Sequence, residues 1–306
     1  MEYNEFRENT SVNEHGHSSP LPREGQGVGL TSSNEHGQSS PLPREGQGVG
    51  LRIVIKVGSN VLTRKDGHLD ITRMSAIIDQ IAWLKQQGHE VILVSSGAVA
   101  CGRRELKVGH DLDTVEQRQL FSALGQVKLI GLYYDLFREH NMHVGQILTM
   151  KENFQPGEQF DNQRACMRVM LENDVIPIVN ENDTVSVTEL MFTDNDELSG
   201  LISQMMNADM LILLSNIDGI FTGHPDDPDS RLIPQVAPGR DLSEYIQTEK
   251  SAFGRGGMHS KYTTATRVQQ SGIKVVIANG EREDILIDLL TSPSTTPHTV
   301  FLSDKK

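Results

Sequence analysis

The sequence has few of the residues that characterise several large classes of protein. Cysteine occurs only twice in 306 residues, as Cys101 and Cys166. Both lie in helix-like or loop-like sequence, which argues against a disulfide framework and against a metal site built from thiolates. We interpret them as inert thiols in or near the core.

Long apolar segments are missing as well. No apolar run reaches the length of a transmembrane helix, and the N-terminus has neither the basic nor the apolar region of a secretory signal. These absences predict a cytoplasmic protein that does not associate with a membrane.

Basic residues are outnumbered by acidic ones. There are 28 lysines and arginines against 41 aspartates and glutamates, which gives a net charge of −13 at pH 7. Such a surface repels nucleic acid, and no basic stripe interleaved with aromatic residues offsets it. We therefore exclude nucleic acid as a partner, and an anionic ligand would require cations that are concentrated locally.

The first fifty residues contain an internal repeat. Residues 13–30 recur at 34–51 with a single change. The repeat is rich in Gly, Pro and Ser and has no apolar periodicity, so it has nothing to bury in a core. We expect residues 1–50 to be a disordered extension, with a ligand-binding tail as the alternative, and residues 51–306 to form the folded domain.

Apolar strands and amphipathic helices alternate from Leu51 onward. Strands are predicted at 51–58, 90–94, 143–149, 175–179, 210–214 and 274–278, and helices from Asp70 or Thr72 to Gly88 and near 114–139, 158–172, 196–206, 259–270 and 281–290. Continuous apolar strands are typical of a parallel sheet that is covered on both faces. The pattern predicts an α/β fold, a three-layer α/β/α sandwich with a mostly parallel central sheet.

Polar residues follow four of the predicted strands. They are K-V-G-S-N at 56–60, S-S-G-A at 95–98, N-E-N-D at 180–183 and S-N at 215–216. Ligands of such sheets bind beyond the carboxyl ends of the strands, so we expect these residues to meet at one site.

A glycine-rich stretch precedes the helix predicted at 259–270. Residues 251–261 read S-A-F-G-R-G-G-M-H-S-K. Glycines let successive backbone amides approach an anion, and the start of a helix adds further amides and the positive end of its dipole. The stretch favours a phosphate-binding loop, with a flexible surface loop as the alternative.

Taken together, these motifs resemble those of the amino acid kinase family. Besides the motifs above, D-N-D at 194–196 fits the family's order and spacing, over about residues 51–290. The motifs are most similar to those of members that phosphorylate the side-chain carboxylate of glutamate at the start of proline synthesis. The resemblance implies ATP as the phosphoryl donor, with Mg²⁺ bound mainly through the phosphates of ATP and water.

The resemblance also implies catalytic roles. Lys56 and Lys261 match the pair that contacts the transferred phosphoryl group, and Asp196 matches the acidic residue that holds both lysines by charge pairing. Gly58 and Ser59 would offer backbone amides to the same group. For Asp196 the alternative is an N-cap of the following helix.

The acceptor is expected at family positions that hold glutamate. These positions are Ser96, Gly97, Asp183 and Asn195, and Gly97 would also offer its amide to the phosphoryl group. The carboxylate of Asp183 suits the α-ammonium of glutamate, whereas hydroxyl and amide groups bind its carboxylates without repulsion. For Asp183 the alternative is a simple turn residue. Asn180 and Glu181 are interpreted as support for the loop.

The nucleotide is expected at Lys56, at the end of the fifth strand and at the glycine-rich loop. The loop and strand residues are Ser215, Asn216, Arg255, Gly256, Gly257, Met258, His259, Ser260 and Lys261. Two departures from the family pattern occur here, because many relatives have Thr-Asp in place of Ser215 and Asn216, and Thr in place of Arg255.

Other expectations follow only from the family. They are a homo-oligomer, either a dimer or a tetramer, and feedback inhibition by proline. Many bacterial relatives carry a C-terminal RNA-binding-like domain of the PUA type, which we expect this chain to lack.

A lid role stays open for residues 218–240. The alternative functions are phosphorylation of aspartate, acetylglutamate, carbamate or UMP, and a nucleotide or amino acid sensor without catalytic activity.

Overall fold

The computed structural model describes residues 50–303, except 109–110, 187–191, 193 and 247–256. The extension predicted at residues 1–50 lies outside the described residues, apart from Gly50. Arg255 and Gly256 of the glycine-rich stretch lie outside them as well.

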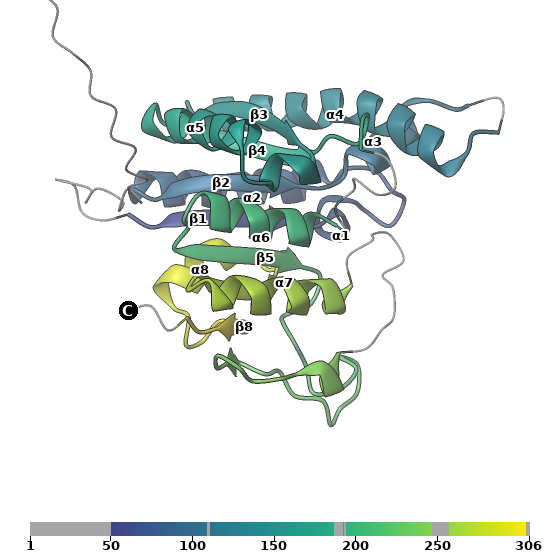
Figure 1. Cartoon of the computed structure of the whole chain (residues 1–306). Coiled ribbons are helices and arrows are strands. Elements are labelled where there is room, and N and C mark those ends of the chain that lie inside the picture. Colours follow the sequence, from purple (N-terminus) through teal and green to yellow (C-terminus); the bar gives the residue numbers. More distant parts are fainter. Residues whose placement is uncertain (1–49, 109–110, 187–191, 193, 247–256, 304–306) are drawn as a thin grey trace, which may run out of the picture. The chain divides into compact units, whose positions relative to one another are not determined.

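The described residues form one eight-stranded sheet, with the strand order β3-β4-β2-β1-β5-β7-β8-β6 (Figure 1). The strands are β1 (Arg52–Val57), β2 (Glu90–Ser95), β3 (His143–Thr149), β4 (Val175–Glu181), β5 (Met210–Ser215), β6 (Gln235–Val236), β7 (Lys274–Asn279) and β8 (His298–Phe301). Every pair is parallel except β7 with β8. Since β1 lies between β2 and β5, the carboxyl ends of three strands meet at the centre of one edge.

Helices cover both faces of the sheet, as predicted (Figure 1). They are α1 (Ser59–Leu62), α2 (Ile71–Gln86), α3 (Ala98–Glu105), α4 (Thr114–Arg138), α5 (Glu158–Glu172), α6 (Asn195–Met205), α7 (Met258–Gln270) and α8 (Ile285–Thr291), with short 3₁₀ helices η1 (Lys151–Phe154) and η3 (Ser243–Tyr245). Helices α2, α4 and α8 share one apolar core with the sheet, and α5, α6 and α7 share the other. No helix in this described part of the chain is both long enough and apolar enough to cross a membrane.

The alternation of side chains along β1 determines where its one lysine points. Ile53, Ile55 and Val57 pack in the core of α2, α4 and α8, whereas Val54 packs in the core of α5, α6 and α7. Successive side chains of a strand point to opposite faces, so Lys56 lies on the same face as Val54. It therefore points toward the layer that contains α6 and α7.

Two helices on the other face begin at carboxylate caps. The side chain of Asp70 accepts a hydrogen bond from the amide of Arg73 at 3.1 Å, which makes Asp70 the cap of α2. Asp113 and Glu116 form a reciprocal capping box at the start of α4. Such caps satisfy amides that have no partner within the helix, and each contributes about 1 kcal/mol.

The sequence pattern did not predict the short helix α1, the two 3₁₀ helices, α3, β6 or β8. The two strands have only two and four residues, and β8 is held by its neighbours rather than by a long apolar run of its own. The hydroxyl of Thr299 in β8 accepts a hydrogen bond from the amide of Ile220 (2.8 Å) and donates one to the carbonyl of Ile233 (2.7 Å). Two points of the lid candidate 218–240 are thereby fixed to the sheet.

The interpretation of the two cysteines is confirmed for one of them. Cys101 is buried in α3, where burial raises the pKa of its thiol. Cys166 is exposed on α5, so its placement in or near the core is wrong. The α5 sequence is apolar on a single narrow face, and Cys166 lies outside that face next to the buried Met167.

The crossing of α3 and α4 provides a test of the packing. A Cβ added to Gly102 of α3 would overlap the carbonyl of Phe121 in α4, whereas nothing lies within 4 Å of a Cβ added to Gly131 of α4. We expect Gly102→Ala to lower the free energy of unfolding by about 1–3 kcal/mol. Gly131→Ala should raise it by about 0.5–1 kcal/mol, because alanine favours the helix. Urea unfolding measures both, and equal effects of the two substitutions would contradict the close crossing.

Candidate active site

The buried carboxylate of Asp196 lies between two lysines. Asp196 is in the first turn of α6, and its side chain has no exposed surface. The Nζ atom of Lys56 lies 2.7 Å from Oδ1, and Nζ of Lys261 donates a hydrogen bond to Oδ2 at 3.0 Å. Strand β1 and helices α6 and α7 therefore bring together three residues that are far apart in the sequence.

The charges of this cluster shift the pKa values of its members. Burial alone would raise the pKa of the Asp196 carboxyl, but the ammonium groups of Lys56 and Lys261 outweigh burial and lower it. Burial lowers the pKa of Lys56, and the negative charge of Asp196 opposes that effect. Asp196 is thus ionised at neutral pH, with each of its oxygens facing an ammonium group.

Asp194 rather than Asp196 caps helix α6. Its Oδ1 accepts hydrogen bonds from the amides of Asp196 (2.9 Å) and Glu197 (3.1 Å). The alternative interpretation of Asp196 as the N-cap is therefore wrong, because the cap lies two residues earlier and the Asp196 side chain faces the lysines instead. Burial and the charge of Asp196 raise the pKa of Asp194, although a hydrogen bond from Ser260 opposes this.

Glycines precede three helices at this edge of the sheet. Gly58, Gly97 and Gly257 are the N-caps of α1, α3 and α7, and none of them supplies a side-chain cap. Gly97 has φ of 104°, in the left-handed region that favours glycine. A Cβ added to Gly58 would lie 3.4 Å from Nζ of Lys56, so this turn approaches the lysine closely. The first amides of α1, at Ser59, and of α3 follow directly after the carboxyl ends of β1 and β2.

Asn195 connects neighbouring strand ends. Its Nδ2 donates hydrogen bonds to the carbonyl of Ser95 (3.0 Å), to Oγ of Ser96 (2.9 Å) and to Oδ1 of Asn180 (3.0 Å). Asn180 in turn donates to Oε1 of Gln126 in α4 at 2.9 Å. Ser96 and Asn195, both expected at the acceptor site, are therefore in direct contact.

Asp183 is held by an arginine that the sequence motifs do not include. Nε of Arg118 donates to Oδ1 of Asp183 at 2.6 Å, and Nη2 donates to Oε2 of Glu181 at 2.5 Å and also contacts Asp183. The other oxygen of Glu181 accepts a hydrogen bond from the amide of Phe192 at 3.0 Å. Asp183 lies in a turn, as its alternative interpretation expected, and it is also buried. Arg118 was missed because one arginine in an amphipathic helix ordinarily lies at the surface.

The expected nucleotide residues lie at two nearby places. Ser215 is buried at the end of β5, beside β1, and Asn216 after it is exposed. Met258, His259, Ser260 and Lys261 form the first turn of α7 behind Gly257. The structure joins Lys261 to the cluster, whereas no hydrogen bond between Ser215 or Asn216 and the two lysines is found among the described residues.

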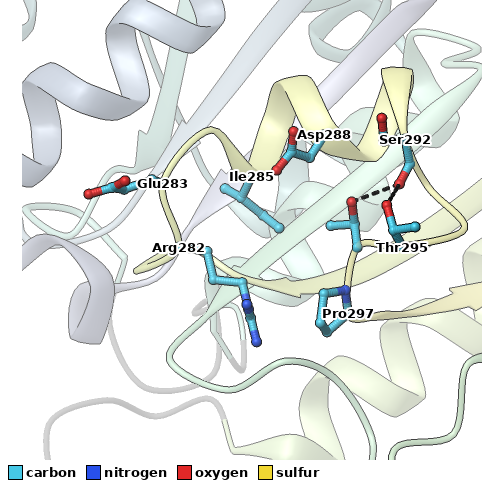
Figure 2. A pocket seen from close by; sticks show the side chains of 8 residues that line it. Arg282, Glu283, Ile285, Asp288, Ser292, Thr295 and Pro297 are labelled. Atoms are coloured by element: carbon cyan, nitrogen blue, oxygen red, sulfur yellow. Dashed lines mark hydrogen bonds between the residues drawn. The ribbon is translucent and has the colours of Figure 1, made fainter.

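Neither a metal-binding group nor the cavity beside α8 coincides with the cluster in the part of the chain that the structure describes. Within the described ranges, no group of three or more His, Cys, Asp or Glu side chains is arranged to hold a metal ion. A cavity of about 600 Å³ lies beside α8, and Figure 2 shows Arg282, Ile285, Asp288 and Pro297 around it. None of the expected site residues lines this cavity. Its Arg282 forms two hydrogen bonds of 2.7 Å with Asp218.

The chain is similar in sequence to several curated proteins. It is 62% identical over 251 residues to the glutamate 5-kinase of Bacteroides thetaiotaomicron, an alignment that covers 82% of this chain and 70% of that protein. It is 46% identical over 236 residues to the glutamate 5-kinase of Chlorobaculum tepidum, which covers 77% of this chain and 65% of that protein. The chain thus spans about two thirds of the length of these relatives.

The fold is also found in solved structures. Carbamate kinase from Giardia lamblia bound to AMP-PNP has a TM-score of 0.60 at 17% sequence identity, with 83% of this chain and 99% of that chain covered. The likeness at this identity concerns the fold alone. The model of the amino acid kinase family matches residues 51–279, the segment that contains β1, α6, α7 and the Lys56–Asp196–Lys261 cluster. The chain belongs to the amino acid kinase family.

Proposed function

We propose that this chain transfers the γ-phosphoryl group of ATP to the side-chain carboxylate of L-glutamate, the first step of proline biosynthesis. The similarity to glutamate 5-kinases supports glutamate as the acceptor. Membership of the amino acid kinase family supports ATP as the donor. The residues are assigned from the geometry of the described cluster and its surroundings.

The observation that carries the proposal is the pair of buried ammonium groups on Asp196. Phosphoryl transfer depends mainly on positioning and on stabilising the charge of the moving group. One shared carboxylate holds Lys56 and Lys261 at a fixed separation, so both can face the phosphoryl group. The backbone amides at Ser59 and Gly97 add donors at the ends of β1 and β2.

The acceptor chemistry agrees with the ionised state of Asp196. The side-chain carboxylate of glutamate carries no proton at neutral pH, so its oxygen attacks the γ-phosphorus without a general base. A new oxygen–phosphorus bond forms while the bond to the β-phosphate oxygen breaks, and ADP leaves. Asp196, with its lowered pKa, positions the lysines and takes no proton.

We assign the acceptor to the residues around Asn195 and Asp183. The hydroxyl of Ser96, the side chain of Asn195 and the amide of Gly97 suit the carboxylates of glutamate. The buried carboxylate of Asp183 suits its α-ammonium group.

We assign the nucleotide to the start of α7 and the end of β5. The residues are Lys56, Ser215, Asn216, Gly257, Met258, His259, Ser260 and Lys261, together with Arg255 and Gly256 outside the described residues. The uncapped amides at the start of α7 and the Lys261 ammonium fit phosphate oxygens. Mg²⁺ is assigned to the phosphates of ATP and to water.

The proposal extends to the setting of the enzyme. We place it in the cytoplasm, where unpaired thiols such as Cys101 and Cys166 persist. Proline carries the α-carboxylate and α-ammonium of glutamate, so it would compete at Asp183. A homo-oligomer is supported by exposed apolar side chains on one face of α4, of which Val127 is 73% exposed and Tyr134 53% exposed.

The reaction itself is tested by ADP release from the full chain with Mg-ATP and glutamate, with hydroxylamine present to trap the acyl phosphate. We expect ADP that depends on glutamate and an equal amount of hydroxamate. A chain that begins at residue 51 should give the same rates, since we assign the whole activity to residues 51–306. Turnover of aspartate but not glutamate would refute the acceptor, and saturable ATP binding without turnover would favour the sensor.

The role of Lys261 is tested by Lys261→Met, which keeps the length of the side chain and removes its charge. We expect kcat to fall by about 10²–10³-fold with little change in the KM for glutamate, because the charge acts on the moving phosphoryl group. Lys128→Met is the control, since Lys128 pairs with Glu105 at the surface. Unchanged turnover in Lys261→Met would refute the assignment.

The role of Asp183 is tested by Asp183→Asn. The amide of asparagine still fills the site beside Arg118, but it has no negative charge to pair with an ammonium group. We expect the KM for glutamate to rise about tenfold or more while kcat changes little. Asp79→Asn in α2, where the carboxylate is 59% exposed, serves as the control. A normal KM in Asp183→Asn would show that the acceptor binds elsewhere.

A further inference from the structure

The ion cluster around Arg118 includes Asp183, which we assign to the acceptor, but Arg118 itself has no role in the reaction described above. The side chain of Arg118 is only 12% exposed, and those of Glu181 and Asp183 are 5% and 8% exposed. Charged groups are rarely buried to this extent unless they are paired.

The guanidinium group fixes the two carboxylates relative to each other. Nε of Arg118 donates to Asp183, and Nη2 donates to Glu181. The donors of a guanidinium are planar and rigid, so they set the direction of each carboxylate, which a lysine ammonium would not do. Glu181 is held a second time by the amide of Phe192. The orientation of the Asp183 carboxylate therefore depends on Arg118.

Helix α4 is anchored to this segment at three successive places. Besides Arg118, Gln119 donates a hydrogen bond to the carbonyl of Thr184 at 2.8 Å, and Gln126 accepts one from Asn180 at 2.9 Å. The helix itself is held against α3 by the close crossing at Gly102. Arg118 thus projects from a rigid element, which suits a group that orients another side chain.

The charge of the cluster selects the kind of ligand group that can bind beside it. Two carboxylates meet here, those of Glu181 and Asp183, and their side chains are largely removed from water. Such a site attracts an ammonium group and repels a carboxylate. The α-ammonium of glutamate is therefore the part of the acceptor that this cluster favours.

We propose that Arg118 is a positioning residue that orients the Asp183 carboxylate toward the α-ammonium of the acceptor. In this way it makes the enzyme specific for a dicarboxylate that carries an amino group. The inference rests on the proposed function and deepens it. Arg118 acts through Asp183 and makes no contact with the transferred phosphoryl group.

The test compares two acceptors in the full chain, glutamate and glutarate, which lacks the ammonium group. Arg118→Lys keeps the charge and removes the planar fork. We expect this substitution to lower kcat/KM for glutamate about tenfold, through KM, and to leave kcat/KM for glutarate and the KM for ATP unchanged. The preference for glutamate over glutarate should therefore fall by the same factor.

Arg52→Lys is the matched control. Arg52 is 17% exposed, and its Nε donates to Glu90 at 2.7 Å, but it lies at the amino end of β1, at the opposite edge of the sheet. The preference for glutamate should stay at the wild-type value in this variant. If Arg118→Lys lowered kcat/KM equally for glutamate and glutarate, the preference for glutamate would not change. Arg118 would then be only a structural ion-pair partner, and the inference would be overturned.

A double-mutant comparison tests the inference independently of the two acceptors. If Arg118 acts only through Asp183, then Arg118→Lys added to Asp183→Asn should cause no further loss of kcat/KM for glutamate. Additive losses would contradict the inference, even if Arg118→Lys also lowers stability. A wild-type chain that phosphorylates another acceptor but not glutamate would overturn the proposed function, and the inference with it.

Discussion

The shared ion pair of Asp196 with Lys56 and Lys261 is the interaction on which the site depends. Burial and the nearby charge of Lys261 lower the pKa of Lys56, and the carboxylate of Asp196 opposes both effects. The carboxylate in turn is stable in a buried position because of the two lysines. The three residues therefore depend on one another, and removing any one of them would change the charge state or position of the others.

The layers and the central strands could be predicted from the sequence because their signals are local. The apolar run of β1 lies in a few consecutive residues, and the spacing of Met74, Ile77 and Ile81 in α2 lies within a few helical turns. These local patterns are enough to predict a sheet that is buried on both faces by helices. Strand polarity also predicts that Lys56 and the other residues at the carboxyl ends of the parallel strands lie at one edge of the sheet, whereas the pairing of Lys56 with Asp196 was implied only by the family resemblance.

The remaining features depend on contacts between distant segments. Nothing near Arg118 in the sequence indicates that it faces Glu181, and only the packing of α4 brings them together. Strand β8 is too short to be distinguished from a loop until it pairs with β7. The sequence pattern offered Asp196 as the N-cap of α6, but the cap is Asp194, two residues earlier. Helix boundaries commonly differ by one or two residues, so a pattern alone does not determine the cap.

The arrangement of Lys56, Asp196 and Lys261 also has a consequence for folding. The three residues come from the first strand, a middle helix and a late helix, so their charges cannot be paired until nearly the whole sheet has been assembled. Contacts between such distant segments form slowly, because the ends of long loops must first be brought together. Chains that stop at a partly folded stage carry unpaired charges in place of this cluster, so binding of nucleotide at the proposed site would report on completed folding.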